Sequence, residues 1–145
     1  MAEFFFDQNE QYTDFEYCFK TDRDGYRSST FHSKCNGKGP AIVIAKSDTG
    51  YIFGGFNAKG WSSGSSYMSE TTGRSWLFTL RNGGGKLPLE RNTGNAYYNN
   101  NGYGPTWGGG HDMYISDNCH TNTNSYFNTG HGYGYSKIGY SSGTA

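Results

Sequence analysis

Tyr103-Gly-Pro-Thr-Trp-Gly-Gly-Gly-His-Asp-Met-Tyr-Ile-Ser-Asp-Asn-Cys119 decides the fold, because three consecutive glycines lead almost directly into a strand-like segment. Glycine has no Cβ, so the triplet at 108–110 permits backbone conformations closed to other residues and lets another group approach closely. Residues 113–115 predict a short strand, and acidic, amide, thiol and imidazole groups crowd the loop that follows. This density of glycine, aromatic and ligand-capable groups indicates a recognition surface.

The other elements are predicted from local patterns. Alternating or β-branched runs predict strands at residues 15–19, 41–45, 51–56 and 75–80. The turn Ser47-Asp-Thr-Gly50 joins the second and third of these into a predicted antiparallel hairpin. Ser28 or Ser29 can cap a short helix that ends at Asn36-Gly37. Segments rich in Gly, Ser or Asn predict ordered loops at residues 59–69, 83–85 and 91–105.

Length and composition indicate a single domain with an aromatic core. The chain has 145 residues, so we expect one domain over residues 1–145, mainly antiparallel β with one or two short helices. Only 33% of the residues are hydrophobic, and 23 glycines further reduce the side chains available for packing. The 13 Tyr, 10 Phe and 3 Trp compensate, because each aromatic ring buries a large area.

The charge balance argues against two classes of partner. The 12 basic and 12 acidic side chains cancel and are scattered along the chain, so they form no basic stripe for a phosphate backbone. We therefore expect no nucleic-acid partner. No apolar run approaches the roughly 20 residues that cross a bilayer as a helix, so we also expect no membrane insertion.

The pairing of Cys18, Cys35 and Cys119 is left open by the sequence. In a reducing compartment all three can be small buried hydrophobic residues, which is the interpretation we favour. In an oxidising compartment one thiol of three is left over, and it could link two copies of the chain.

The side chains after the glycine triplet suggest metal or thiol chemistry only weakly. Ordinary ligand types occur at His111, Asp112, Asp117, Cys119 and His120. These residues match neither the spacing of paired histidines on a helix nor an EF-hand, so we expect no cofactor. The alternative is a calcium ion bound by Asp112, Asp117 and Asn118. We favour the interpretation that these three side chains cap turns instead. Neighbouring residues of an extended chain point to opposite faces, so Cys119 and His120 cannot share a proton directly. His32 and Cys35 lack an oxyanion-hole signal, and no carboxylate pair suits glycoside chemistry, so we expect no enzymatic activity.

Several motifs, in one order, resemble the TLDc domain family. They are Phe31-His-Ser-Lys-Cys-Asn-Gly-Lys-Gly-Pro40, Gly50-Tyr-Ile-Phe-Gly-Gly-Phe56 with Trp61-Ser-Ser-Gly64, Ser75-Trp-Leu-Phe-Thr-Leu80, the glycine-triplet segment 103–115, and Asp117-Asn-Cys119 with Asn124-Ser-Tyr126. The resemblance implies a β-sandwich with small helices, a link to oxidative-stress resistance or to binding of the proton-pumping V-type ATPase, and no agreed catalytic residues. The family's final strand, rich in Val, Ile and Glu, has no counterpart in residues 139–145. We therefore expect a TLDc-like sandwich shortened at the C-terminus, with an open sheet edge on which a second copy could dock.

The region around the glycine triplet also combines the features of a sugar site. Such a site needs an aromatic platform, carboxylate or amide acceptors, and backbone that a ligand can approach closely. The candidate ligand-binding residues are Tyr103, Trp107, Gly109, Gly110, His111, Asp112, Asp117 and Asn118. The competing interpretation is that Trp107 belongs to the core and that the glycines only form a tight bend.

These observations favour a non-catalytic lectin for glycans, with galactose-type sugars as the suggested ligands. A homodimer would give weak sites avidity. The alternative is a TLDc-type protein-interaction domain in oxidative-stress resistance or V-type ATPase binding. A lectin of this kind would be secreted or extracellular, whereas the stress protein would be cytoplasmic.

Overall fold

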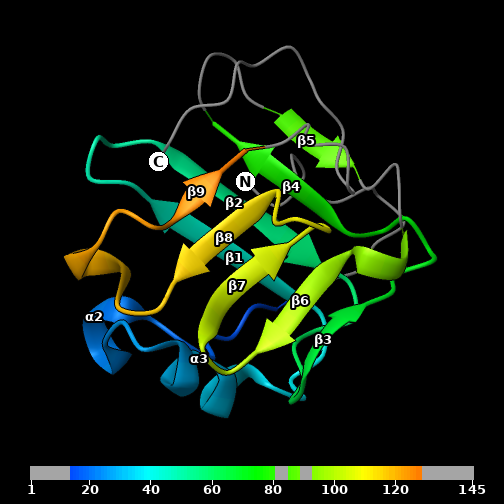
Figure 1. Ribbon diagram of the computed structural model, residues 1–145, viewed down its shortest axis with the longest axis horizontal. Helices are drawn as coiled ribbons and strands as arrows, with labels where there is room; N and C mark the ends of the chain where they lie inside the picture. Colours follow the sequence, from blue (N-terminus) through cyan, green and yellow to red (C-terminus); the bar gives the residue numbers. More distant parts are fainter. Residues whose placement is uncertain (1–13, 81–84, 89–92, 129–145) are drawn as a thin grey trace.

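Two antiparallel sheets form a β-sandwich (Figure 1), as expected from the sequence. The computed structural model describes residues 14–80, 85–88 and 93–128. One sheet has the order β1-β2-β4-β5, with β1 at Ala41–Lys46, β2 at Ile52–Asn57, β4 at Trp76–Thr79 and β5 at Gly85–Pro88. The other has the order β3-β6-β7-β8-β9, with β3 at Ser65–Met68, β6 at Tyr97–Asn100, β7 at Tyr103–Trp107, β8 at Met113–Ser116 and β9 at Tyr126–Phe127.

The core lies between the sheets and is built from aromatic rings. The main buried cluster takes Phe53 and Leu77 from the first sheet and Tyr97, Trp107 and Met113 from the second. Residues of one face alternate with residues of the other along a strand, so each of these strands contributes only every second side chain to the core. The expectation of an aromatic core is confirmed.

The predicted hairpin is formed by β1 and β2. Ala41 pairs with Asn57 and Lys46 with Ile52, and the turn closes through hydrogen bonds from Ser47 N to Tyr51 O and from Gly50 N to Ser47 O. Gly50 has a φ of +89°, a conformation that residues with a Cβ rarely adopt. The hairpin predicted from the turn residues and from the strand pattern is therefore confirmed.

Two glycines in β2 let the layers of the fold approach closely. A Cβ at Gly54 would overlap the Val43 carbonyl, and one at Gly55 would crowd Leu77 and lie 3.0 Å from the Trp107 ring. Gly55 consequently sets the distance between β2 and the indole of the opposite sheet. A side chain at Gly55 would force the sheets apart, whereas one at Gly54 would disturb the pairing of β1 and β2 within one sheet.

Two short helices lie at one end of the sandwich. Helix α2 spans Thr21–Asp24 and α3 spans Ser28–Cys35, so a helix lies where it was predicted and ends before Asn36-Gly37. The predicted serine cap is wrong, because Arg27 is the N-cap residue of α3 and makes no side-chain cap hydrogen bond. Phe31 and Cys35 of α3 enter the main core cluster, so the helix closes that end. Two 3-10 turns occur at Thr93–Asn95 and Cys119–Thr121.

Three segment predictions are wrong. Residues 15–19 form no strand; instead Cys18 is tied to α3, and Phe19 packs edge-on against Phe31 at a ring-centroid distance of 5.7 Å. The segment 59–69, expected to be a loop, contains β3, and the segment 91–105 contains β6 and part of β7. The asparagine-rich composition hid the strand, because Asn is depleted in strands and common in turns.

Parts of two expectations lie outside the described residues. These are residues 83 and 84 of the predicted glycine loop and the C-terminal segment for which a shortened sandwich was expected. Gly85 begins β5. Within residues 14–80, 85–88 and 93–128, no helix has the length and apolar character needed to span a membrane.

Candidate functional site

The outer face of the second sheet is lined by aromatic rings. Tyr97 of β6 points into the core and is 1% exposed, whereas its neighbour Tyr98 is partly exposed on the opposite face. On β8, Met113 is buried while Tyr114 meets Tyr126 of β9 edge-on, at a ring-centroid distance of 5.7 Å. The alternation of the strands therefore sorts the aromatic residues into a core set and a surface set.

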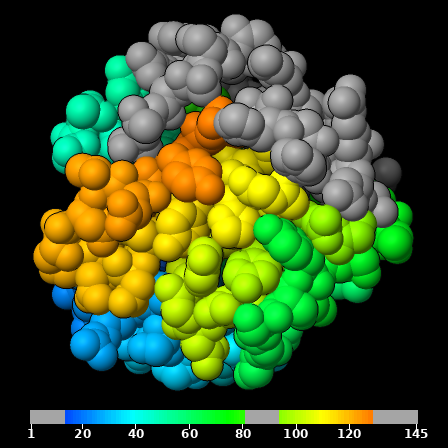
Figure 2. Space-filling view, viewed as in Figure 1, coloured from blue at the N-terminus to red at the C-terminus, as the bar shows by residue number. Residues whose placement is uncertain are grey.

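We call the surface set the ring surface. It consists of Tyr67, Tyr98, Tyr103, His111, Tyr114 and Tyr126, which come from all five strands of the sheet and the turn between β7 and β8. Neighbouring rings lie 4.9 to 6.1 Å apart between centroids. Figure 2 shows this side of the molecule, where side chains from β6 to β9 reach the surface and no helix lies over them. The rings form one continuous aromatic area.

His111 lies at the centre of the ring surface. Its ring is 5.5 to 6.1 Å from those of Tyr67, Tyr98, Tyr103 and Tyr114. The glycine triplet places it there, since His111 N donates to the carbonyl of Gly108 and His111 itself has a φ of +64°. A non-glycine residue in this conformation is uncommon and carries local strain, which the surrounding structure must hold.

The ring surface carries no charge at neutral pH. None of β3, β6, β7, β8 and β9 contains a Lys, Arg, Asp or Glu. Burial lowers the pKa of His111 below its ordinary value, so its imidazole is neutral at pH 7. Burial also raises the pKa values of Tyr114 and Tyr126, which keeps both phenols protonated.

Trp107 does not offer the exposed platform expected from the sequence. The residue is 0% exposed, and its ring meets Trp61 edge-on at 5.0 Å. It lies on the inner face of β7, where Met113 is its cross-strand partner. The interpretation of Trp107 as a surface platform is therefore wrong, and the competing interpretation of a core residue is confirmed.

Asp112 is also enclosed. It is 1% exposed, and its carboxylate packs so closely against Gly108 that a Cβ at that glycine would overlap it. Gly108 has a φ of +81° as well, so glycine is required there for two reasons. The missing side chain at Gly108 therefore makes room for the Asp112 carboxylate inside the turn, and this carboxylate does not face the solvent.

Asp117 and Asn118 hold a helix in place at the other end of β8. Asp117 Oδ1 accepts a hydrogen bond from Ser28 N at 2.7 Å, which caps the first turn of α3. Asn118 Nδ2 donates to Asp117 Oδ2 at 2.8 Å, and Asn118 N donates to the carbonyl of Tyr26 at 3.0 Å. Asp117 therefore caps a backbone N–H as the favoured interpretation expected, but this N–H belongs to a helix distant in sequence and not to a nearby turn.

The structure thus brings together only part of the predicted site. Tyr103 and His111 join the ring surface, and Gly109 and Gly110 form the turn beside it, with Gly110 N donating to the Tyr67 hydroxyl at 3.3 Å. Trp107 and Asp112 lie beneath the surface and Asp117 and Asn118 beyond β8. Sequence reasoning missed Tyr67, Tyr114 and Tyr126, and it placed the segment 97–103 near the site without singling out Tyr98. The alternation at Tyr97 to Asn100 was the signal that could have found part of this set.

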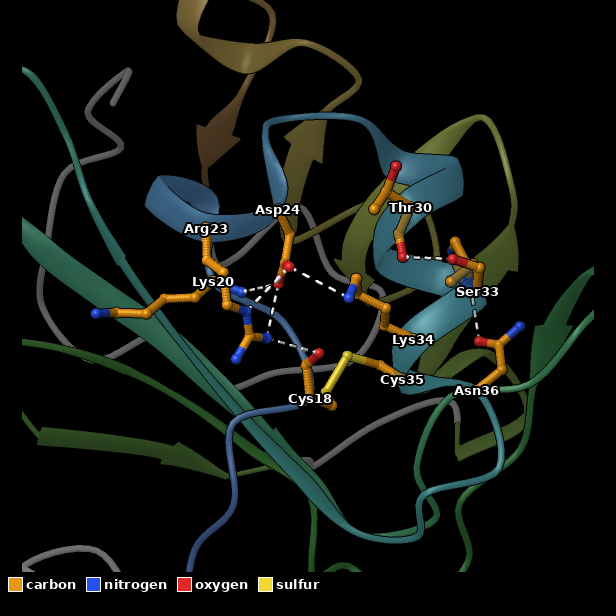
Figure 3. The surroundings of a disulfide bond; sticks show 10 residues. Cys18, Lys20, Arg23, Asp24, Thr30, Ser33, Lys34, Cys35 and Asn36 are labelled. Atoms are coloured by element: carbon orange, nitrogen blue, oxygen red, sulfur yellow. Dashed lines mark hydrogen bonds and ion pairs between the residues drawn. A yellow bond between two sulfur atoms is a disulfide. The ribbon is translucent and has the colours of Figure 1, made fainter.

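A disulfide joins Cys18 to Cys35 in the last turn of α3 (Figure 3). The favoured interpretation of three unpaired cysteines is therefore wrong, and Cys119 is the free thiol. Burial raises the pKa of the Cys119 thiol, which keeps it protonated. His120 stacks on Tyr26 at a centroid distance of 4.1 Å.

Asp24 links the two helices beside this disulfide. Its carboxylate accepts hydrogen bonds from the Arg23 guanidinium at 2.7 Å and from Lys20 N at 2.9 Å, and Lys34 Nζ of α3 lies 3.2 Å away (Figure 3). The hydrogen bond from Arg23, helped by those from Lys20 N and Lys34, holds the pKa of Asp24 well below its ordinary range. The carboxylate is a junction between α2 and α3.

We expect Asp24→Asn to weaken the fold and to change its acid sensitivity. A carboxyl whose folded pKa is depressed contributes stability above its unfolded pKa of about 3.9, and that contribution disappears as the pH falls towards the folded value. The variant should melt at a lower temperature than wild type near pH 7, with a shallower loss of stability below about pH 4. Thermal melts across this range measure both effects. Asp22→Asn, at a more exposed carboxylate on the same helix, is the control; equal acid profiles for wild type and Asp24→Asn would contradict the role of Asp24.

The side chains that the sequence offered for catalysis or metal binding have other bonding partners or lie apart from one another. Cys35 is oxidised, and His32 Nε2 donates to the Tyr103 carbonyl at 3.0 Å, so these two residues form no nucleophile pair. Among the side chains that the structure describes, no three His, Cys, Asp or Glu residues are grouped to hold a metal ion. The ring surface offers a partly exposed, uncharged area for contact.

A family model for the TLDc domain matches residues 2–143. Searches of curated proteins and of solved structures find no significant match.

Proposed function

Because the chain belongs to the TLDc domain family, we propose that it is a non-catalytic protein-interaction domain. The match over residues 2–143 is the observation that carries this proposal, since it spans nearly the whole chain. The partner classes that follow from the family resemblance are the V-type ATPase and components of the oxidative-stress response.

The chemistry of the described residues supports binding over catalysis. General acid–base and nucleophilic catalysis need titratable groups within hydrogen-bonding reach of each other and of a substrate. The titratable groups nearest the glycine triplet are a neutral imidazole among phenols and an enclosed carboxylate, at His111 and Asp112. The rings that surround His111 among the described residues are those of Tyr67, Tyr98, Tyr103 and Tyr114, a setting that suits contact with a partner.

The disulfide sets a condition on how the interaction must be tested. Structural disulfides persist in oxidising surroundings and are rare in a reducing cytosol. The bridge fixes Cys18 against the last turn of α3, so we expect reduction to change the surface next to the helix. Binding must therefore be measured with the disulfide formed and with it reduced.

A pull-down with purified peripheral subunits of the V-type ATPase tests the proposal. The full chain is immobilised in its oxidised and reduced forms, and the heat-unfolded chain is the control. We expect a folded form to retain a subunit and the unfolded chain to retain none. Retention by neither folded form, together with no effect of the chain on the survival of cells under peroxide, would overturn the proposed function.

A further inference from the structure

We propose that the ring surface is a binding site for neutral glycan chains, a function that goes beyond the protein interaction proposed above and does not depend on it. The site is the outer face of the second sheet and does not include the buried Trp107. The proposal rests on the chemistry of the six rings, on the polar groups at their edge and on the absence of charge among them.

The rings supply the apolar part of the site. Pyranose sugars present patches of C–H groups that pack on aromatic faces, while their hydroxyls need hydrogen-bond partners around the rim. Tyr103, Tyr114 and Tyr126 form a row across β7, β8 and β9, with centroid separations of 5.1 and 5.7 Å. Tyr67 and Tyr98 continue the area across β3 and β6, at 4.9 Å from each other. An area spanning five strands can contact several sugar units in succession.

The hydroxyl groups supply the polar part. Among the described residues, no hydrogen-bond partner occurs for the hydroxyls of Tyr103, Tyr114 or Tyr126. Each phenol can donate one hydrogen bond and accept others, which suits the hydroxyl arrays of sugars. These three side chains are partly exposed, so one ligand can reach both a ring and its hydroxyl.

Amide and hydroxyl side chains border the rings on the β3 and β6 side. Asn100 Nδ2 donates to Ser65 Oγ at 2.8 Å and to the Tyr98 hydroxyl at 3.3 Å; Ser65 is exposed, and Tyr98 and Asn100 are partly exposed. Asn100 Oδ1 accepts from Gly102 N, which fixes the amide orientation. The border is therefore preorganised and polar without being charged.

The lack of charge favours a neutral glycan over the other occupants. Nucleic acid and anionic lipid need cations, which the ring surface does not contain. Protein interfaces also use tyrosine, but they add arginine and methionine to it. Serine and asparagine take those positions around Tyr98, which matches hydroxyl recognition.

A glycan array followed by isothermal titration tests the inference. The oxidised full chain is applied to neutral glycans and to their sialylated and sulfated counterparts, and the best neutral glycan is then titrated. The double variant Tyr98→Ser with Tyr114→Ser should bind it at least about tenfold more weakly, because two stacking faces are lost. Tyr114→Phe, which keeps the ring and removes only the hydroxyl, should lose less. Tyr17→Ser, at a tyrosine that is 72% exposed outside the ring surface, is the matched control and should bind normally.

Thermal melts confirm that each variant is folded before titration. Binding of no neutral glycan, binding only to sialylated or sulfated glycans, or equal binding by wild type and the double variant would each overturn the inference. Loss of ATPase subunits in the pull-down by the double variant, without glycan binding by wild type, would identify the surface as a protein interface and also overturn it. Retained subunits with no glycan binding would remove this inference and leave the proposed function standing.

Discussion

Trp107→Ala should be the most damaging single substitution in the domain, with a loss of on the order of 3 to 5 kcal/mol in the free energy of unfolding. The side chain is fully enclosed and joins Trp61 and the β2 glycine Gly55 across the core. Its removal leaves a cavity that the facing sheets cannot close, because Gly55 has no side chain to fill it. A small domain has only about 5 to 15 kcal/mol of stability, so the variant is expected to be partly or wholly unfolded at 37 °C.

Urea denaturation followed by far-ultraviolet circular dichroism measures this loss. Trp107→Phe keeps an aromatic ring in the same position and should cost less, which keeps the test informative if the alanine variant does not fold. Tyr17→Ala is the control, because surface substitutions usually change stability by less than about 0.5 kcal/mol. A denaturation midpoint for Trp107→Ala equal to that of wild type would show that the indole is not part of the core.

Removal of the disulfide by Cys18→Ala with Cys35→Ala should cost roughly 3 kcal/mol, the second large effect. The bridge closes a loop with a sequence separation of 17, and cross-links of this span restrict the unfolded chain by about that amount. The bridge also anchors the residues that lead into α2, where Arg23 Nη2 donates to the Cys18 carbonyl at 3.2 Å. The helical end of the sandwich should therefore loosen first.

Comparison of wild type with the double alanine variant by urea denaturation measures the effect, and hydrogen exchange locates it. Cys119→Ala is the matched control and should leave both unchanged, since Cys119 is the free cysteine. Thiol titration of the unfolded, unreduced chain should count one reactive thiol out of three cysteines. Three reactive thiols, or equal stability of the double variant and wild type, would contradict the assigned pairing.

The parts of the fold that could be predicted are those in which local and long-range signals agree. The hairpin of β1 and β2 has β-branched or aromatic residues on both sides of an Asp-Thr-Gly turn, and this pattern predicts an antiparallel pair of strands. The helix α3 was located by the serines near its start, although neither serine caps it, and by Gly37, which adopts the positive φ expected at a helix end. Family resemblance added the sandwich arrangement, which periodicity alone does not specify.

The errors arise where composition and position conflict. Asn99 is fully buried on the inner face of β6, and its amide donates to Ser62 Oγ at 2.8 Å. A run of asparagines indicates a turn by composition, yet here Asn99 and Asn100 belong to β6, the first buried and the second partly exposed. At the other end, the alternation of residues 15–19 suggested a strand, but a covalent bond to a distant cysteine decides the position of that segment.

The candidate site was predicted in the right region and on the wrong face. Trp107 and His111 are close in sequence, and the sequence does not say that the indole turns inward while the imidazole turns outward. The bulge in β7 between Tyr103 and Thr106 makes this harder, because it shifts the alternation within a single strand. The ring surface also depends on strand pairing, since Tyr67 and Tyr126 approach it only through β3 and β9.

The orientation of β6 is the claim on which the binding surface depends, and tyrosine nitration by tetranitromethane tests it most directly. Tyr97 and Tyr98 are adjacent, but burial raises the pKa of Tyr97 to about 12, whereas hydrogen bonds from Ser65 and Asn100 lower that of Tyr98. Nitration requires an accessible phenol that can ionise. Peptide mass spectrometry of the briefly treated native chain should find the nitro group on Tyr98 and not on Tyr97, with both modified after unfolding. Equal or faster nitration of Tyr97 in the native chain would show that β6 faces the other way, and the ring surface would not exist.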